Sequence, residues 1–113
     1  MLKKKLRVSK QVFKEAFKKG RFLSSLYLSL RFFRENSLQS SKFSFTVPKS
    51  VSKKAITRNL LKRRGYSAVK KLKNINNSYV LIFSFKKGGE KASFSELETE
   101  IENLLKKAKI IDF

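Results

Sequence analysis

The residues of this chain that could do chemistry are cations gathered in one segment. Positions 57–73 read TRNLLKRRGYSAVKKLK, and neither Asp nor Glu occurs anywhere from position 36 to position 89. Lys and Arg side chains bind phosphate groups, and an Asn or Tyr among them can bond to a base edge or stack on a base. The chemistry that this segment offers is the binding of a nucleic acid.

Groups that catalyse hydrolysis near neutral pH are scarce. The 113 residues include neither His nor Cys, which removes the usual general base and the usual zinc ligands. Six of the eight acids lie between Glu90 and Asp112, mostly along one predicted helix. A protein-only nuclease needs clustered carboxylates to hold its metal ions. The sequence therefore predicts no catalytic residue and no metal ligand in this chain.

The net charge of +20 is unevenly distributed. Positions 1–89 hold 24 Lys and Arg residues against Glu15 and Glu35, whereas positions 90–113 carry a slight acidic excess. Such a charge repels itself unless a polyanion neutralises it, and nucleic acid does so by counterion release. An anionic membrane surface is the alternative partner, but the sequence lacks a basic amphipathic helix with a broad apolar face.

The predicted compartment follows from what the chain lacks. No apolar run approaches the roughly 18 residues of a membrane span, and the basic N-terminus lacks the apolar core of a signal peptide. The chain has no Cys and therefore no disulfide that would indicate an oxidising compartment. We predict a cytoplasmic protein.

Apolar periodicity predicts the elements that position the cations. In chain order they are a helix over 9–20, strands over 27–33 and 42–47, a helix over 55–73, a strand over 79–85 and a helix from 93 onward. The segment YVLIFSF at 79–85 is almost wholly apolar, which is typical of a central strand covered on both faces. Ser93 and Glu96 form a capping box. This order predicts one α+β domain over residues 1–113, a two-layer α–β sandwich with room for a further strand before the long helix.

A helical wheel divides the long helix into two faces. An arc of about 100° holds the predicted buried stripe, namely Leu61, Gly65, Ala68, Val69 and Leu72. The neighbouring arc holds Asn59, Lys62, Arg63, Tyr66, Lys70 and Lys73, with Arg58 at the border and Arg64 on the opposite flank. A merely solvated surface is the alternative interpretation of such a charge run, but the helix has no acids to pair with its cations. We therefore predict that this face contacts nucleic acid.

At these residues the chain resembles the bacterial ribonuclease P protein family. The family pattern is roughly S-K-K, a few residues, then A-V-x-R-N-R-x-K-R-x-x-R, and this chain reads VPKSVSKKAITRNLLKRRGYSAV. The matching positions are Ala55, Ile56, Arg58, Asn59, Lys62 and Arg63. Departures occur at Ser50, Leu60 and Tyr66, where the family has Lys, Arg and Arg. Upstream, LRVSKQVFKEAFKKGRF resembles the family's first helix, with Phe13, Phe17 and Gly20 at its aromatic and glycine positions.

The resemblance implies a fold and a function. The fold is the ribosomal protein S5 domain 2-like sandwich with a left-handed βαβ crossover. The implied function is that of the protein subunit of a ribonucleoprotein endonuclease, in which a catalytic RNA holds the Mg²⁺ and cleaves the 5′ leader from precursor tRNA. No obligate protein partner is implied. A structural RNA-binding protein, such as a small ribosomal protein, is the alternative that composition cannot separate.

The resemblance also assigns site residues. The implied contacts to the RNA subunit are Lys49, Lys53, Lys54, Arg58, Asn59, Lys62, Arg63, Arg64, Tyr66 and Lys70. The implied contacts to the leader are Phe13, Phe17 and Arg31. Two aromatics four residues apart on a helix can equally be core residues, so a structural role for Phe13 and Phe17 is the alternative.

Overall fold

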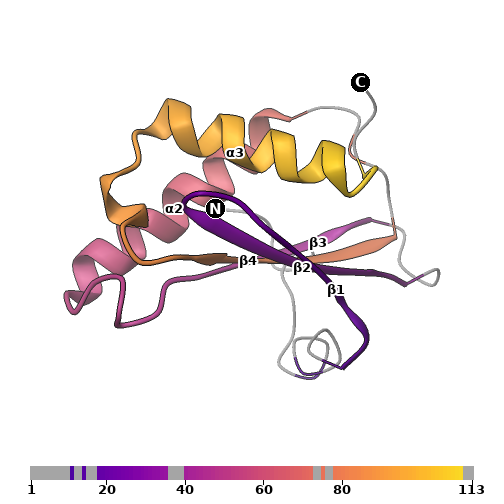
Figure 1. Ribbon diagram of the computed structural model, residues 1–113, viewed down its shortest axis with the longest axis horizontal. Helices are drawn as coiled ribbons and strands as arrows, with labels where there is room; N and C mark the ends of the chain where they lie inside the picture. Colours follow the sequence, from indigo (N-terminus) through magenta and orange to yellow (C-terminus); the bar gives the residue numbers. More distant parts are fainter. Residues whose placement is uncertain are drawn as a thin grey trace.

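In the part of the chain that the structure describes, the helices α2 (Ala55–Lys71) and α3 (Phe94–Lys107) pack on the same face of one mixed sheet (Figure 1). The computed structural model describes residues 11, 14, 18–35, 40–72, 75 and 78–110. Its elements are β1 (Arg21–Ser24), β2 (Leu28–Arg34), β3 (Lys42–Thr46), α2 (Ala55–Lys71), β4 (Tyr79–Phe85), the short 3-10 helix η2 (Gly89–Lys91) and α3 (Phe94–Lys107). The strand order is β1-β2-β4-β3. Strand β2 pairs antiparallel with β1 and β4, and β3 pairs parallel with β4.

The elements agree with those predicted from apolar periodicity. The three predicted strands and the long helix lie within two residues of their expected bounds, and β1 is the further strand for which the predicted order left room. Of the predicted first helix, the described positions are Gln11, Lys14, Lys18, Lys19 and Gly20; the first four are helical, and Gly20, at the predicted end, is not. Ser9, where the sequence predicts this helix to begin, lies outside the described residues. The α+β sandwich is confirmed.

Strand β4 lies at the centre of the sheet and is buried on both faces. Leu81 and Phe83 point toward α2 and α3 and are fully buried in the main core. Val80 and Ile82, which alternate with them, are buried on the opposite face of the sheet. A strand that is buried on both faces has a continuous apolar sequence. This explains why the segment YVLIFSF correctly predicted a central strand.

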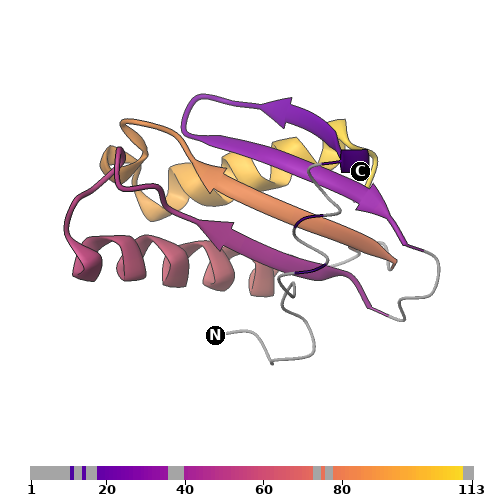
Figure 2. The same ribbon diagram turned by 90° about the horizontal axis from the view of Figure 1, so that it is seen from below.

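The connection from β3 through α2 to β4 is the unusual feature of the topology. In Figure 2 the sheet lies in front of the helices, β3 and β4 run side by side in the same direction, and α2 joins them from behind. With both strands turned to point upward in this view, the path moves to the right behind the sheet, so the crossover is left-handed. Almost all βαβ crossovers are right-handed, and the left-handed form is the one that the family resemblance implied.

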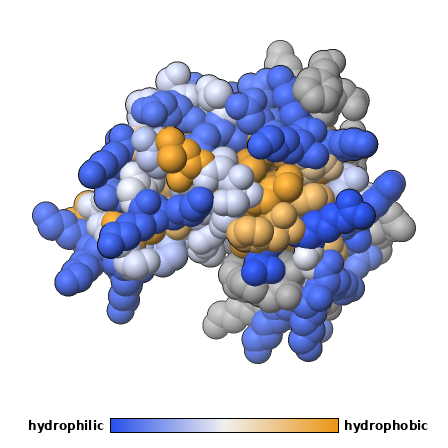
Figure 3. Space-filling view, in the orientation of Figure 1, coloured by the Kyte–Doolittle hydropathy of each residue, from blue (hydrophilic) through white to orange (hydrophobic). Residues whose placement is uncertain are grey.

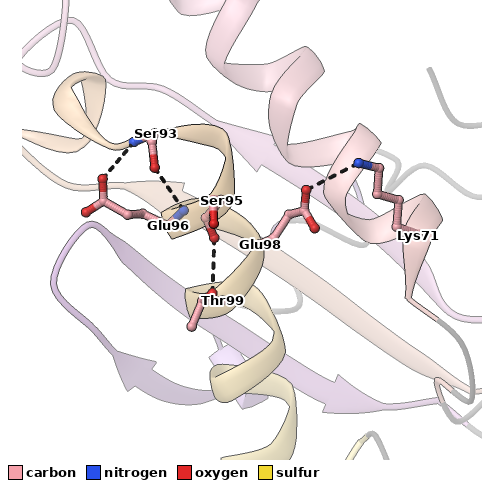
Figure 4. Close-up of polar contacts among 6 residues, drawn as sticks. All are labelled: Lys71, Ser93, Ser95, Glu96, Glu98 and Thr99. Carbon is pink, nitrogen blue, oxygen red and sulfur yellow. Dashed lines mark hydrogen bonds and ion pairs between the residues drawn. The ribbon is translucent and has the colours of Figure 1, made fainter.

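Helix α3 closes the core over β2. Ser93 Oγ accepts a hydrogen bond from the Glu96 N–H at 3.1 Å, and the Glu96 carboxylate accepts one from the Ser93 N–H at 3.0 Å (Figure 4). The predicted capping box is therefore confirmed. Farther along α3, Glu100 Oε1 accepts hydrogen bonds from the Ser25 hydroxyl and the Tyr27 N–H. These bonds tie the turn between β1 and β2 to α3.

Gly65 lets α2 lie close against the sheet. The ring of Phe45 on β3 stacks on Phe83, with centroids 4.9 Å apart and planes 8° apart. A Cβ atom at position 65 would lie 2.4 Å from that ring. Because Phe45 is 3% exposed and its ring stacks on Phe83, the ring has little room to move. A glycine is thus required here by close approach.

Gly65→Ala should destabilise the protein, although the same change in an exposed helix usually stabilises it by about 1 kcal/mol. Forcing a methyl group into this contact costs about 1–3 kcal/mol, so we expect a net loss of about 1–2 kcal/mol in the free energy of unfolding. Urea denaturation measures it. Ser67→Ala, at an exposed position of the same helix, is the matched control and should stabilise slightly. A Gly65→Ala variant more stable than the parent would contradict the close contact.

Candidate RNA interface

The turn between β3 and α2 presents three lysines at the start of the helix. Lys49, Lys53 and Lys54 are exposed. Lys54 is the N-cap of α2, its side chain makes no capping hydrogen bond, and the first turn of the helix contains no acid. Backbone N–H groups at a helix N-terminus carry a partial positive charge that attracts phosphate. The turn therefore combines three ammonium groups with the positive end of a helix dipole.

Arg58 shapes this turn from the first part of α2. Its Nη1 donates hydrogen bonds to the carbonyl oxygens of Ser52 at 3.0 Å and Lys53 at 2.9 Å. The residue is half-buried, so part of the guanidinium is used within the protein. Arg58 thus holds the lysine-bearing turn against the helix. Its contact with RNA stays a prediction.

The cations and the Asn of α2 lie on its solvent side. Asn59, Arg63 and Lys70 are exposed, and Lys62 and Arg64 are half-buried. On the opposite side the predicted stripe of Leu61, Gly65, Ala68 and Val69 is buried, and Leu72 is half-buried. The cationic surface, as we define it, consists of Lys49, Lys53, Lys54, Arg58, Asn59, Lys62, Arg63, Arg64 and Lys70. In Figure 3, hydrophilic side chains project around much of the visible face, with apolar side chains gathered in patches between them.

Lys71, at the last position of α2, is neutralised by α3 instead. Its Nζ lies 3.3 Å from Glu98 Oε1 (Figure 4) and 4.6 Å from the centroid of the Phe94 ring. This ion pair is exposed, so it contributes little to stability. It does remove one positive charge from the end of α2, so the charge open to a polyanion is greatest at the beginning of the helix.

The structure corrects the assignment of Tyr66 to the RNA-binding face. Tyr66 is 7% exposed, its ring packs edge-on against Phe45 with centroids 5.0 Å apart, and its hydroxyl accepts a hydrogen bond from the Phe45 N–H at 3.4 Å. The predicted stacking of Tyr66 on a base is wrong. The wheel placed Tyr66 within the cationic arc, but Phe45 of β3 lies close enough for the ring to pack against it, and a large aromatic side chain gains free energy by leaving water.

The sheet face opposite to α2 and α3, here called the outer face, carries Arg31. The strand register places Arg31 between Phe22 of β1 and Ile82 of β4. Arg31 is half-buried, and its Cζ lies 5.2 Å from the centroid of the Phe22 ring. Phe13 and Phe17, the other two predicted leader contacts, lie outside the described residues.

Phe22 is a candidate residue that the sequence analysis missed. It is 55% exposed on the outer face, beside Arg31. Strand β1 is only four residues long, too short for a period-of-two pattern to stand out. One signal in the sequence could have identified it. A strand that begins after Gly20 would direct Phe22 and Leu23 to opposite faces of the sheet.

Hydroxyl side chains gather at one end of the outer face. Ser29, Ser84 and Thr46 lie on β2, β4 and β3 in neighbouring register positions, and all are half-buried. This is the end at which β3 leads into the turn that carries Lys49 and Lys53. The outer face and the cationic surface therefore adjoin, and a single extended polyanion could contact both.

The acidic side chains of the described chain are dispersed. Within residues 18–35, 40–72 and 78–110 and the three isolated described positions, no three acidic side chains come together as a metal site requires. In the same part of the chain, no helix is both long and apolar enough to cross a membrane. The arrangement offers phosphate binding and base stacking.

Comparison with known proteins places the chain in a family. The sequence model of the family described as Ribonuclease P matches residues 2–109. The chain is 27% identical over 100 residues to the Ribonuclease P protein component of Pseudanabaena sp. (strain PCC 6903), covering 88% of this chain and 86% of that protein. It is 36% identical over 89 residues to the protein of the same name from Fusobacterium nucleatum, covering 74% of this chain and 78% of the relative.

The fold agrees with the sequence comparisons. A 2.0 Å structure of the Staphylococcus aureus RNase P protein superposes with a TM-score of 0.85 at 18% identity, covering 95% of this chain and 98% of that one. The chain therefore belongs to the ribonuclease P protein family, the protein component of a ribonucleoprotein endoribonuclease that acts in tRNA 5′ maturation.

Proposed function

We propose that this chain binds the catalytic RNA of ribonuclease P through its cationic surface and holds the 5′ leader of precursor tRNA on its outer face. The observation that supports this most is the start of α2, where three exposed lysines surround a helix N-terminus without an acid or a side-chain cap. Phosphates of a folded RNA suit such a surface because they complement both the ammonium groups and the helix dipole. The cytoplasm, where tRNA is processed, is the proposed location.

The leader is assigned to the outer face because it is unpaired RNA. Unpaired bases can stack on aromatic side chains and bond to hydroxyls and amides, whereas a folded RNA duplex offers mainly phosphates and riboses. Arg31 and the half-buried hydroxyls supply such groups next to the cationic surface. Phe13 and Phe17 join the proposed leader site on the family resemblance alone.

The Mg²⁺ ions of the reaction are assigned to the RNA. The described carboxylates are dispersed, and Glu96, Glu98 and Glu100 are engaged in a helix cap, an ion pair and a turn contact. The protein's proposed contribution is to position precursor tRNA and to screen phosphate charge. No step of bond cleavage is assigned to its side chains.

The pure protein should not cleave precursor tRNA with Mg²⁺ present, because the chain contains no His to act as the usual general base and its described carboxylates form no metal cluster. Adding the cognate RNA subunit should restore cleavage at the mature 5′ end. Gel analysis of the 5′ leader product measures both. Specific cleavage by the RNA-free protein would refute the division of labour, and failure of the protein to stimulate any ribonuclease P RNA at physiological Mg²⁺ would refute the proposed function and favour a structural RNA-binding protein.

Lys62→Ala and Arg63→Ala should each weaken binding to the RNA subunit and flatten its salt dependence. Each lost phosphate contact lowers the slope of log K against log salt by about one unit. Arg58→Ala should do the same and also lower the melting temperature, because the bonds to Ser52 and Lys53 are lost. Filter binding over a salt series measures the slope.

Lys71→Ala is the matched control for these variants. Lys71 is also a cation of α2, but Glu98 already neutralises it, so its removal should leave the slope nearly unchanged. Equal effects of Lys71→Ala and Arg63→Ala would mean that the helix contributes only net charge and that the cationic surface is misplaced.

A further inference from the structure

Phe22 is an exposed aromatic side chain at a position where core packing does not require one. It is 55% exposed, whereas the next residue, Leu23, packs against the core. Strand β1 is an edge strand, and its alternation directs Phe22 to the outer face. Single exposed apolar residues are common on proteins, so the neighbours of Phe22 decide whether it has a role.

The guanidinium of Arg31 holds one side of the Phe22 ring. The two residues are direct cross-strand partners, and the Arg31 Cζ lies 5.2 Å from the ring centroid. A cation in this position is attracted by the ring's quadrupole. The strand that carries Phe22 is itself anchored, since Lys86 Nζ donates hydrogen bonds to Ser24 Oγ at 2.9 Å and to the Ser25 carbonyl at 2.7 Å. Both the ring and the end of its strand therefore have contacts that do not require a ligand.

This pair matches the chemistry of unpaired RNA. An aromatic ring offers a stacking surface to any base, and stacking of this kind tolerates sequence variation. Arg31 lies against the ring, and Lys86 contacts Ser24 on the same strand, so both cations are available to attract the phosphates of a nucleotide stacked on Phe22. Neither β1 nor β2 contains an acid that would repel those phosphates.

A second copy of the chain fits this surface less well. An exposed edge strand can pair with another chain, but two molecules of net charge +20 repel each other. Arg21 and Arg31 lie on or beside β1 and add to that repulsion. Charge complementarity therefore favours a polyanion.

We propose that Phe22, held by Arg31, stacks against one unpaired nucleotide of the precursor leader and extends the leader site to the edge strand β1. The inference rests on the proposed function, since it requires the leader to lie on the outer face. In this proposal Phe22 raises the affinity for tRNA that carries a leader and has little effect on the affinity for mature tRNA.

The test is substrate binding by the reconstituted holoenzyme carrying Phe22→Ala. We expect affinity for precursor tRNA with a long leader to fall by about fivefold to 100-fold, the effect of losing one base–aromatic stack. Affinity for mature tRNA should not change. Equal losses for both RNAs, or no loss for the precursor, would overturn the proposal.

Two further substitutions make the test specific to stacking. Phe22→Tyr keeps a flat ring and should bind the precursor as the parent does, whereas Phe22→Leu keeps apolar bulk without a ring and should behave like Phe22→Ala. Leu26→Ala removes an even more exposed apolar side chain, 72% exposed, from the turn after β1 and should have no effect. Parent-like binding by Phe22→Leu would show that stacking is not involved.

Failure of this inference can be told apart from failure of the proposed function. If the holoenzyme cleaves precursor tRNA and Arg31→Ala weakens leader binding but Phe22→Ala does not, the inference alone fails. If the chain stimulates no ribonuclease P RNA, both fail. Sedimentation of the free protein provides the remaining check, because a parent dimer that Phe22→Ala converts to a monomer would assign the ring to self-association and overturn the proposal.

Discussion

The seating of α2 on the parallel pair β3–β4 is the contact on which the rest of the structure depends. Phe45 lies between Gly65 and Tyr66 of the helix and Phe83 of the central strand. Gly65 has no side chain, so the Phe45 ring fits under the helix at this point. This contact fixes the rotation of α2 about its own axis. That rotation turns Arg63 and Lys70 to solvent and brings the start of the helix beside the end of β3. The left-handed crossover decides which face of the sheet α2 covers, and so leaves the outer face free of α2.

Charge is the second constraint, and it opposes folding. A helix without a single acid among so many cations gains nothing from internal ion pairs, and the load of +20 destabilises the folded chain. In the described part of the chain, the Lys71–Glu98 and Lys106–Glu102 ion pairs offset a small part of this repulsion, and the lysines at the C-terminal end of α3 complement its dipole. The apolar core formed by β2, β4 and α3 must therefore hold the cations in place until RNA neutralises them.

Two surfaces of different chemistry follow from this frame and lie next to each other. The cationic surface has point charges and a helix N-terminus, which suit the phosphates of a folded RNA. The outer face has hydroxyls, a guanidinium and an exposed ring, which suit unpaired nucleotides. The proposed function gives both surfaces a common purpose, because it requires the RNA subunit and the unpaired leader to be held together. In that proposal the side chains of the two surfaces bind RNA and take no part in the cleavage.

Much of this protein can be predicted from the order of its residues, because it depends on local pattern. Continuous apolarity placed β4 at the centre of the sheet, the Ser93–Glu96 spacing marked the start of α3, and the acid-free run around Arg58 and Arg63 indicated nucleic acid. The ordered motifs also led to the family. Tertiary structure alone decided three matters. Tyr66 is buried because Phe45, 21 residues earlier in the chain, packs against it. Arg58 donates hydrogen bonds to the preceding turn. Phe22 contacts Arg31 only because β1 pairs with β2. Each depends on a neighbour brought close by folding, and periodicity along one segment carries no information about such a neighbour.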